Sequence, residues 1–331
     1  MEKHWCRCDF GVTFRSFAAI LAVGLLAAAA PAPTVLAPSE IVAAAPASDW
    51  VPIAPSDLLV MDLAADRDGN KRRVVIQLMP PPFSQGWVGN IRKLAAVHWW
   101  DGLSVNRVQD NYVVQWGDAD GEDKAKARKL PEGLAMVPER DYRSATKDVK
   151  FAFPMSGLPK MPPNLQATVD HKARKDPYGF GVFGGGWPLA TNGPGAWPVH
   201  CYGMVGVGRN LSPDTGTGAE LYTVIGHAPR HLDRNIALVG RVILGIENLS
   251  SLPRGTGALG FYEKPEQRVT ITSIRLGNEV ADPPRYQYLS TESASFAKYA
   301  DARANRRDAF FIVPAGGADI CNIPVPVRKA P

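Results

Sequence analysis

Proline and glycine interrupt this chain at short intervals, and no other feature limits its fold as much. Its 331 residues include 31 glycines and 29 prolines. Proline removes a backbone donor, and glycine weakens the interior of a helix or strand, so this composition argues against a helical bundle. With 45% hydrophobic and 21% charged residues, the chain has the composition of a folded protein rather than a disordered or collagen-like one. At roughly 100–200 residues per domain, the length allows one decorated domain or two modest ones.

The first 50 residues have the layout of an export signal, which starts with three basic residues: Lys3, Arg7 and Arg15. An uncharged apolar run over 17–29 follows, and a proline-rich stretch begins at Pro31. The run falls short of the about 20 apolar residues that a membrane-spanning helix needs, so an uncleaved anchor is the weaker alternative. We expect a signal peptide over 1–29, with a later cleavage site near Ala47 as the alternative, then a Pro/Ala-rich linker over 30–56 and a mature periplasmic protein.

Two cysteines, Cys201 and Cys321, remain after such a cleavage, since Cys6 and Cys8 lie within the expected signal. In an oxidising compartment they would be able to pair and close a large loop. Two unpaired thiols that pack as small hydrophobic side chains fit the sequence equally well. Both alternatives stay open at this point.

Short apolar segments separated by turn residues follow from residue 58 on. The first half of the chain predicts a β-hairpin of 58–62 and 73–78, a helix over 86–97, and strands at 105–108 and 112–116. Segments of similar length return at 201–207, 221–225, 236–242 and 268–276, with a short helix at 245–252. Strands of this kind indicate a mainly β protein, a closed barrel or a sandwich that carries a few helices.

Two segments fall outside this regular pattern. Residues 119–198 mix charged stretches with proline and glycine clusters and have few periodic runs, so we expect an insertion or long loops there. Residues 281–331 are a different piece, in which 292–307 has helical composition and the end is punctuated by proline. We expect this piece to be a C-terminal extension wrapped onto the barrel.

An ordered set of short motifs resembles the cyclophilin-type peptidyl-prolyl isomerases. In the first half the motifs are Asn90-Ile-Arg-Lys-Leu94, Trp100-Asp101-Gly102, Asn106-Arg107-Val108 and Tyr112-Val-Val-Gln115-Trp-Gly-Asp118. In the second half they are Gly203-Met-Val-Gly-Val-Gly-Arg209, the strand from Glu220 to Ile225, and Leu232-Asp233 followed by Leu238-Val-Gly-Arg-Val242. The resemblance covers about residues 58–118 and 200–277. It implies a closed antiparallel β-barrel with flanking helices over 57–280, carrying the insertion and the C-terminal extension.

The resemblance also implies a reaction in which no covalent bond is made or broken. An X-Pro amide rotates against a barrier of ~18–20 kcal/mol that arises from amide resonance. A guanidinium is suited to this reaction, because its fixed donors can hydrogen-bond the developing lone pair on the prolyl nitrogen. Arg107 matches the family's catalytic arginine, and Gln115 matches the amide that holds the substrate backbone.

The remaining family positions describe a substrate-binding groove with a less aromatic proline pocket. The matching residues are Tyr112, Val113, Gly208, Arg209, Leu221, Thr223, His231, Leu232 and Ile236. Thr223 and Val113 stand where the family has Phe and Met, which predicts weaker contact with the proline ring. Either Glu220 or Leu221 falls where the family has Gln, because the gap between Arg209 and Gly218 is not fixed. The alternative to an isomerase is a catalytically weak module that binds a periplasmic protein partner through the same groove.

The sequence indicates no metal ion, nucleotide or other cofactor. Its six histidines include no pair at metal-ligand spacing with an acidic partner, and no glycine cluster has the strand–helix context of a phosphate loop. The net charge of +5 is spread along the chain, so no nucleic-acid partner is indicated. The partners that the resemblance implies are proline-containing unfolded or extended polypeptides, and we expect no stable membrane insertion after signal cleavage.

Overall fold

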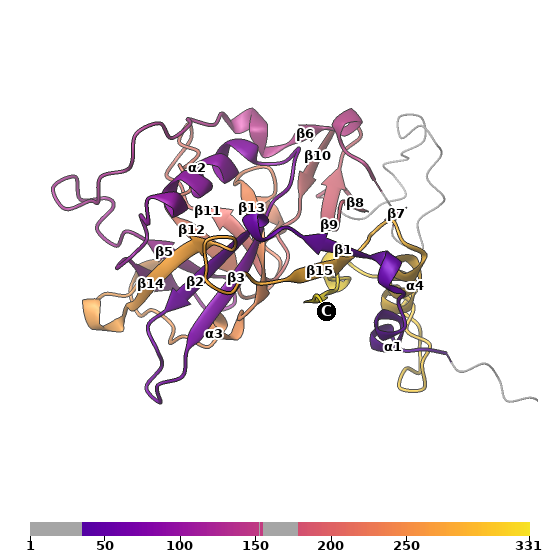
Figure 1. The fold of residues 1–331 in the computed structure, drawn as a ribbon. Helices are drawn as coiled ribbons and strands as arrows, with labels where there is room; N and C mark the ends of the chain where they lie inside the picture. The colour runs from indigo at the N-terminus through magenta and orange to yellow at the C-terminus, as the bar shows by residue number, and fades with distance from the viewer. Residues whose placement is uncertain (1–34, 152, 155–177) are drawn as a thin grey trace, which may run out of the picture. The chain divides into compact units, whose positions relative to one another are not determined.

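The computed structural model describes residues 35–151, 153–154 and 178–331, so the expected signal peptide over 1–29 lies outside the described residues. Its centre is a closed barrel in which every neighbouring pair of strands is antiparallel, in the order β11-β12-β5-β4-β14-β2-β3-β13 (Figure 1). Its strands are β2 (Leu58–Leu63), β3 (Arg72–Leu78), β4 (Ser104–Val108), β5 (Val113–Gly117), β11 (Met204–Val207), β12 (Leu221–Val224), β13 (Leu238–Leu244) and β14 (Val269–Leu276). The mainly β fold with a closed antiparallel barrel is therefore confirmed.

The predicted helix over 86–97 is confirmed as α2 (Gln85–Ala96). Its apolar residues recur at helical spacing and pack on the barrel, with Trp87, Ile91 and Leu94 fully buried. The indole of Trp87 donates to the carbonyl oxygen of Thr215 at 3.0 Å, which ties the helix to the loop between β11 and β12. The other helices are α1 (Pro38–Ala43), α3 (Glu247–Ser250) and α4 (Ala294–Ala304).

A second sheet lies within 119–198, so this segment is more regular than the long loops that the sequence indicates. It has five strands in the order β6-β10-β9-β8-β7: β6 (Ser144–Ala145), β7 (Phe153–Pro154), β8 (Phe180–Gly184), β9 (Trp187–Thr191) and β10 (Gly195–Pro198). Residues 119–138 remain irregular, as expected. The strands 180–198 were missed because they are buried on both faces and contain Gly and Pro, so no alternation of polar and apolar residues marks them.

A third sheet joins the two ends of the described chain in the order β1-β15-β16. Its strands are β1 (Trp50–Ile53), β15 (Tyr286–Leu289) and β16 (Val327–Lys329). The linker expected over 30–56 is therefore wrong from residue 35 on, because Trp50 and Ile53 are buried and pair with Leu289 and Tyr286. The C-terminal extension packs on the rest of the fold, and its expected helix is α4, which lies against α1.

One apolar core runs through the barrel, the second sheet and the C-terminal extension. It includes Val205 in the barrel, Trp187 in the second sheet and Phe296 in α4, all of them buried. Short 3-10 turns connect the elements, at Ala47–Asp49, Pro55–Asp57, Glu139–Tyr142, Thr146–Asp148, Arg230–Leu232, Ala258–Gly260, Pro265–Gln267 and Ile320–Asn322. The insertion and the extension thus share the core of the barrel.

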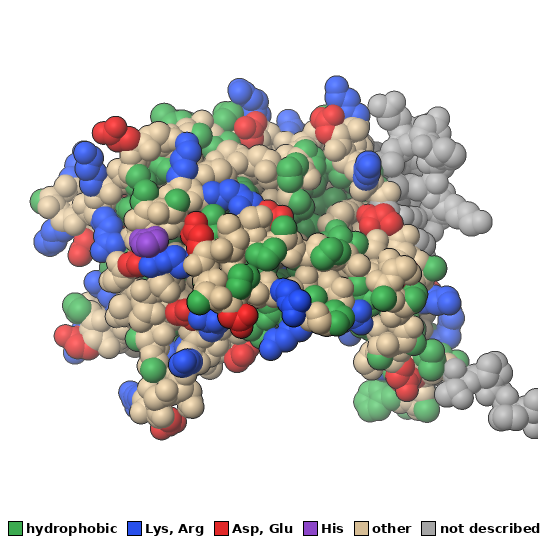
Figure 2. Space-filling view, in the orientation of Figure 1, with side chains coloured by type: hydrophobic (Ala, Val, Ile, Leu, Met, Phe, Trp, Pro, Cys, Tyr) green, Lys and Arg blue, Asp and Glu red, His purple; other side chains and the backbone are tan. Residues whose placement is uncertain are grey.

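The surface carries mixed charges. On the face drawn in Figure 2, Lys and Arg side chains alternate with Asp and Glu and do not gather in one stripe. Within the described ranges, no helix combines the length and the apolar character that crossing a bilayer requires.

Cys201 and Cys321 form a disulfide in the structure, with Cα atoms 5.1 Å apart and 120 residues of separation along the chain. The bridge ties the residues before β11 to the 3-10 turn at Ile320–Asn322 in the C-terminal extension. Of the two alternatives that the sequence leaves open, the structure contains the bridge.

Removal of the bridge tests its contribution to stability. We expect the double variant Cys201→Ser, Cys321→Ser to lose about 4 kcal/mol of unfolding free energy, because a crosslink across so long a loop restricts the unfolded chain. Urea unfolding of the two proteins without reductant measures the difference. Equal unfolding midpoints with equal slopes would contradict the expectation.

Candidate functional site

Most of the predicted site residues line one cavity of about 570 Å³ on the outside of the barrel. Eight of them do so: Arg107, Tyr112, Val113, Gln115, Gly208, Arg209, Leu232 and Ile236. His231 lies at the edge, where its ring stacks on that of Tyr112 with centroids 6.4 Å apart. Leu221 and Thr223 do not line the cavity.

Arg107 and Gln115 face each other across the β4–β5 pair, where the register shifts between Val105 and Arg107. The guanidinium donates through Nε to the carbonyl oxygen of Leu259 at 2.7 Å and through Nη1 to Gln115 Oε1 at 3.1 Å. Its Nη2 donates to Gln109 Oε1. Burial lowers the pKa of Arg107, but an arginine with so high an ordinary pKa stays charged at physiological pH. The cation is thus held in one orientation.

An apolar wall stands beside this cation. Val113, Tyr222 and Val224 form a buried cluster apart from the main core, with Tyr112, Leu232 and Ile236 packed against it. The guanidinium carbon of Arg107 lies 5.8 Å from the ring centre of Tyr112 and 5.3 Å from that of Phe261. The cavity therefore combines a fixed cation with a small apolar pocket.

Two predicted site residues on β12, Leu221 and Thr223, are displaced by one position from the residues that line the cavity. Tyr222 pairs with Gln115 and lines the cavity together with Glu220. Because side chains alternate between the two faces of a strand, Leu221 and Thr223 point the other way. Leu221 belongs to the main core, and Thr223 is fully buried, with its hydroxyl donating to the carbonyl oxygen of Met204 at 3.2 Å. Of Glu220 and Leu221, between which the sequence leaves the choice open, Glu220 lines the cavity and Leu221 does not.

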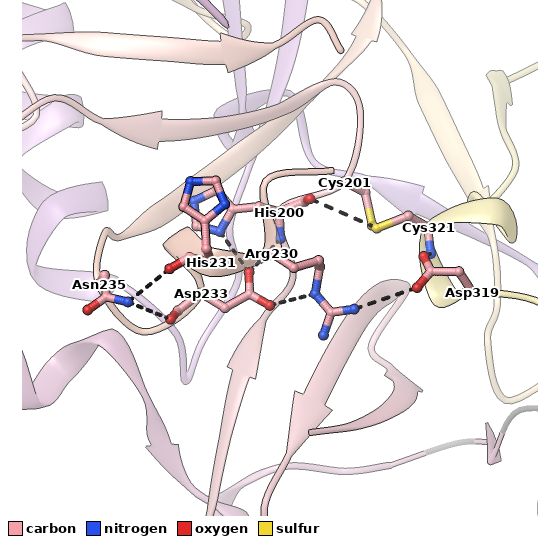
Figure 3. Close-up of polar contacts among 8 residues, drawn as sticks. All are labelled: His200, Cys201, Arg230, His231, Asp233, Asn235, Asp319 and Cys321. Carbon is pink, nitrogen blue, oxygen red and sulfur yellow. Dashed lines mark hydrogen bonds and ion pairs between the residues drawn. A yellow bond between two sulfur atoms is a disulfide. The ribbon is translucent and has the colours of Figure 1, made fainter. Parts of the chain in front are cut away.

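The hydroxyl of Tyr222 is held by a chain of buried polar side chains that the sequence does not predict. His200 Nε2 lies 2.9 Å from the Tyr222 hydroxyl, and His200 Nδ1 lies 2.8 Å from Asp233 Oδ1 (Figure 3 shows the His200–Asp233 part). Burial lowers the pKa of His200, so the neutral ring donates from Nδ1 to Asp233 and accepts the tyrosine hydroxyl at Nε2. Arg230 Nε donates to the second Asp233 oxygen at 2.7 Å. No local motif signals this chain, because its members are distant in sequence.

Glu220 places a carboxyl group inside the cavity. One of its oxygens accepts the backbone N–H of Asp118 at 2.6 Å. Burial raises the pKa of Glu220 to about 7, and the nearby Asp118 carboxylate adds to the shift. An ideal Cβ on Gly117 would lie 2.0 Å from a Glu220 carboxylate oxygen, so only glycine at 117 leaves room for this group.

The chemistry available at the site is hydrogen bonding and apolar contact. Within the described ranges, no group of three or more His, Cys, Asp or Glu side chains is arranged to hold a metal ion. What the cavity offers is a positioned guanidinium, an amide and a carboxyl, all beside an apolar wall.

Comparisons with known proteins address the family and the fold. A family model described as "Cyclophilin type peptidyl-prolyl cis-trans isomerase/CLD" matches residues 68–276. The crystal structure of the cyclophilin AquaCyp293 from Hirschia baltica is similar with a TM-score of 0.60 and 18% identity, covering 85% of this chain and 94% of that chain. A cyclophilin type peptidyl-prolyl cis-trans isomerase from Cryptosporidium parvum is similar with a TM-score of 0.38 and 12% identity, covering 66% of this chain and 96% of that chain. Comparison with curated proteins gives no match. Because the family model covers well over half of its residues, the chain belongs to the cyclophilin-type peptidyl-prolyl cis-trans isomerases.

Proposed function

We propose that this protein rotates X-Pro bonds of extended polypeptides by hydrogen bonding from Arg107 to the prolyl nitrogen. Rotation breaks the amide resonance and leaves a lone pair on that nitrogen, and a donor that is already in place stabilises the twisted state without reorganising. The observation that carries the proposal is the fixed guanidinium beside an apolar pocket. Neighbouring groups use three of its five N–H donors within the described part of the chain, which leaves two for a substrate.

The proline ring would lie against the apolar wall. Val113, Leu232 and Ile236 supply aliphatic contact, and the ring of Tyr222 supplies an aromatic surface. The pocket therefore offers more aromatic contact to the proline ring than the sequence predicts when Thr223 is placed there. The aromatic surface of Tyr222 supports an isomerase that turns over its substrate. The aliphatic Val113 and Ile236, taken alone, would favour the alternative, a binding module without catalysis.

The adjacent Gln115 would hold the peptide backbone on one side of the rotating bond. Its oxygen accepts from Arg107, so its nitrogen faces away from the cation and is available to a carbonyl group. A peptide fixed at one side while the other side turns is the geometry that amide rotation requires.

We propose further that the protein acts on exported polypeptides in the periplasm. Two observations support this: the signal-like layout of residues 1–29, and the Cys201–Cys321 disulfide, which persists in oxidising compartments.

Substitution of Arg107 tests the catalytic proposal. We expect Arg107→Ala to lower kcat/KM for X-Pro peptides by about 10²-fold, the scale of losing one preorganised donor. Arg107→Lys should fail as well, because an ammonium lacks the planar fork. A protease-coupled or NMR exchange assay measures the rates, with circular dichroism as the folding control. Full activity in both variants would contradict the catalytic role of Arg107.

A pair of substitutions at neighbouring positions tests which face of β12 contacts the substrate. Tyr222→Leu should raise KM by roughly 3–10-fold with a smaller change in kcat, because it removes aromatic contact with the proline ring. The matched control, Thr223→Val, is nearly isosteric and faces the barrel interior, so KM should not change. An increase in KM for Thr223→Val alone would show that Thr223 is the residue in contact.

Fractionation tests the proposed location. The protein expressed in a Gram-negative host should appear in the periplasmic extract with a new N-terminus near residue 30 or residue 48. N-terminal sequencing of the purified protein identifies the cleaved bond. Intact chain recovered in the membrane fraction would contradict cleavage.

A further inference from the structure

Glu220 is enclosed in a space shaped for its carboxyl group. One of its oxygens accepts the Asp118 N–H, and the nearby side-chain amides of Gln115 and Asn106 favour its ionised form, which partly offsets the effect of burial on its pKa. Glycines make the room on two sides, since an ideal Cβ on Gly117 or Gly208 would lie 2.0 Å or 2.9 Å from atoms of Glu220. The carboxyl is therefore built into the wall of the cavity and does not extend freely into solvent.

Gln115 on β5 lies between this carboxyl and Arg107. Arg107 donates to Gln115 Oε1 at 3.1 Å, and the amide nitrogen lies on the Glu220 side, because an ideal Cβ on Gly208 would lie 3.6 Å from Gln115 Nε2 and 2.9 Å from Glu220 Cβ. An amide has an acceptor at one end and donors at the other, so its partners decide which way it faces. An ionised carboxylate only accepts, and it therefore takes the nitrogen end and leaves the oxygen for Arg107.

Protonation of Glu220 removes this constraint. A neutral carboxyl carries an O–H that can donate to the Gln115 oxygen. The reversed amide would then turn its N–H groups toward the guanidinium, and two donors cannot bond to each other. Gln115 would no longer support Arg107, and its nitrogen would no longer face the groove.

Several charged or titratable groups share the cavity with Glu220. Asp118 follows β5 and repels the ionised form, whereas Arg107 lies on the far side of Gln115. The others lie on the surrounding loops and on β12: Tyr112, Glu122, Arg128, Arg209, Asp214 and Tyr222. Burial raises the pKa of Glu220 to about 7, so the carboxyl changes its charge within the physiological range.

We propose that Glu220 is a positioning residue of the isomerase site, which in its ionised form fixes Gln115 in the orientation that braces Arg107 and presents an N–H to the peptide. This inference rests on the proposed function. It adds that turnover depends on the ionisation of one carboxyl group that does not touch the rotating bond.

The pH profile of kcat/KM tests the proposal. Wild type should gain about fivefold between pH 5.5 and pH 8.5, the ratio that one ordinary hydrogen bond produces, with a midpoint near 7. Glu220→Gln, which has a donor and an acceptor at every pH, should give a flat profile below the wild-type plateau. His231→Gln is the control for the titratable ring at the rim and should keep the midpoint near 7. A flat wild-type profile, or the same rise in Glu220→Gln, would overturn the proposal.

Two readouts that need no turnover separate this inference from the proposed function. The Gln115 side-chain NH₂ resonances should shift through pH 7 in wild type and stay constant in Glu220→Gln. A carboxyl whose folded pKa lies above its ordinary value of 4.5 stabilises the fold at low pH, and this stabilisation is lost as the pH rises through 7. The urea midpoint of wild type should therefore fall relative to that of Glu220→Gln as the pH rises from 4.5 to 7. If both changes occur without any isomerase activity, the proposed function fails and the Glu220–Gln115 coupling stands; if the Gln115 resonances do not move, the coupling fails.

Discussion

Closure of the eight-strand barrel is the constraint on which the site depends. The ladder from β11 round to β13 leaves no free edge, so β5 is fixed between β4 and β12 and cannot slide. That fixed register sets Arg107 opposite Gln115 and Gln115 opposite Tyr222. Loops then add what the strands cannot supply: Leu259 accepts from the guanidinium, and Asp118 donates to Glu220. A rigid frame thus holds a site whose members come from distant parts of the chain.

A chain of buried polar contacts connects the pocket to the C-terminal extension. Tyr222 hydrogen-bonds to His200, His200 to Asp233, and Asp233 to Arg230. Arg230 also lies 3.8 Å from Asp319, two residues before the disulfide-bonded Cys321 (Figure 3). Such a buried polar chain is stabilising only when each member is satisfied, so the extension completes the environment of the pocket wall.

Most strands of the barrel and the residues at the centre of the site could be predicted from the sequence, but the pairings between distant strands could not. Alternating apolar segments and the spacing of α2 were enough to predict these elements, and the motif around Arg107 and Gln115 was enough to bring both into one cavity. The side of β12 that faces the cavity was missed because the gap between Arg209 and Gly218 does not fix the register of the following strand, and a shift of one residue exchanges Tyr222 for Thr223. The second sheet and β1 were missed because Gly, Pro and distant partners hide their strand character.

The third sheet can form only late in synthesis, because its strands come from both ends of the described chain. Translation delivers β1 early, but its partner β15 is made only near the end, and β16 after that. Until then the edge of β1 is unpaired, and unpaired edges are templates for aggregation. A polypeptide that stops before residue 286 leaves both edges of β1 open, whereas β15 covers one of them once it has been made. A product truncated before residue 286 thus differs from the 331-residue chain in the exposed backbone groups of β1.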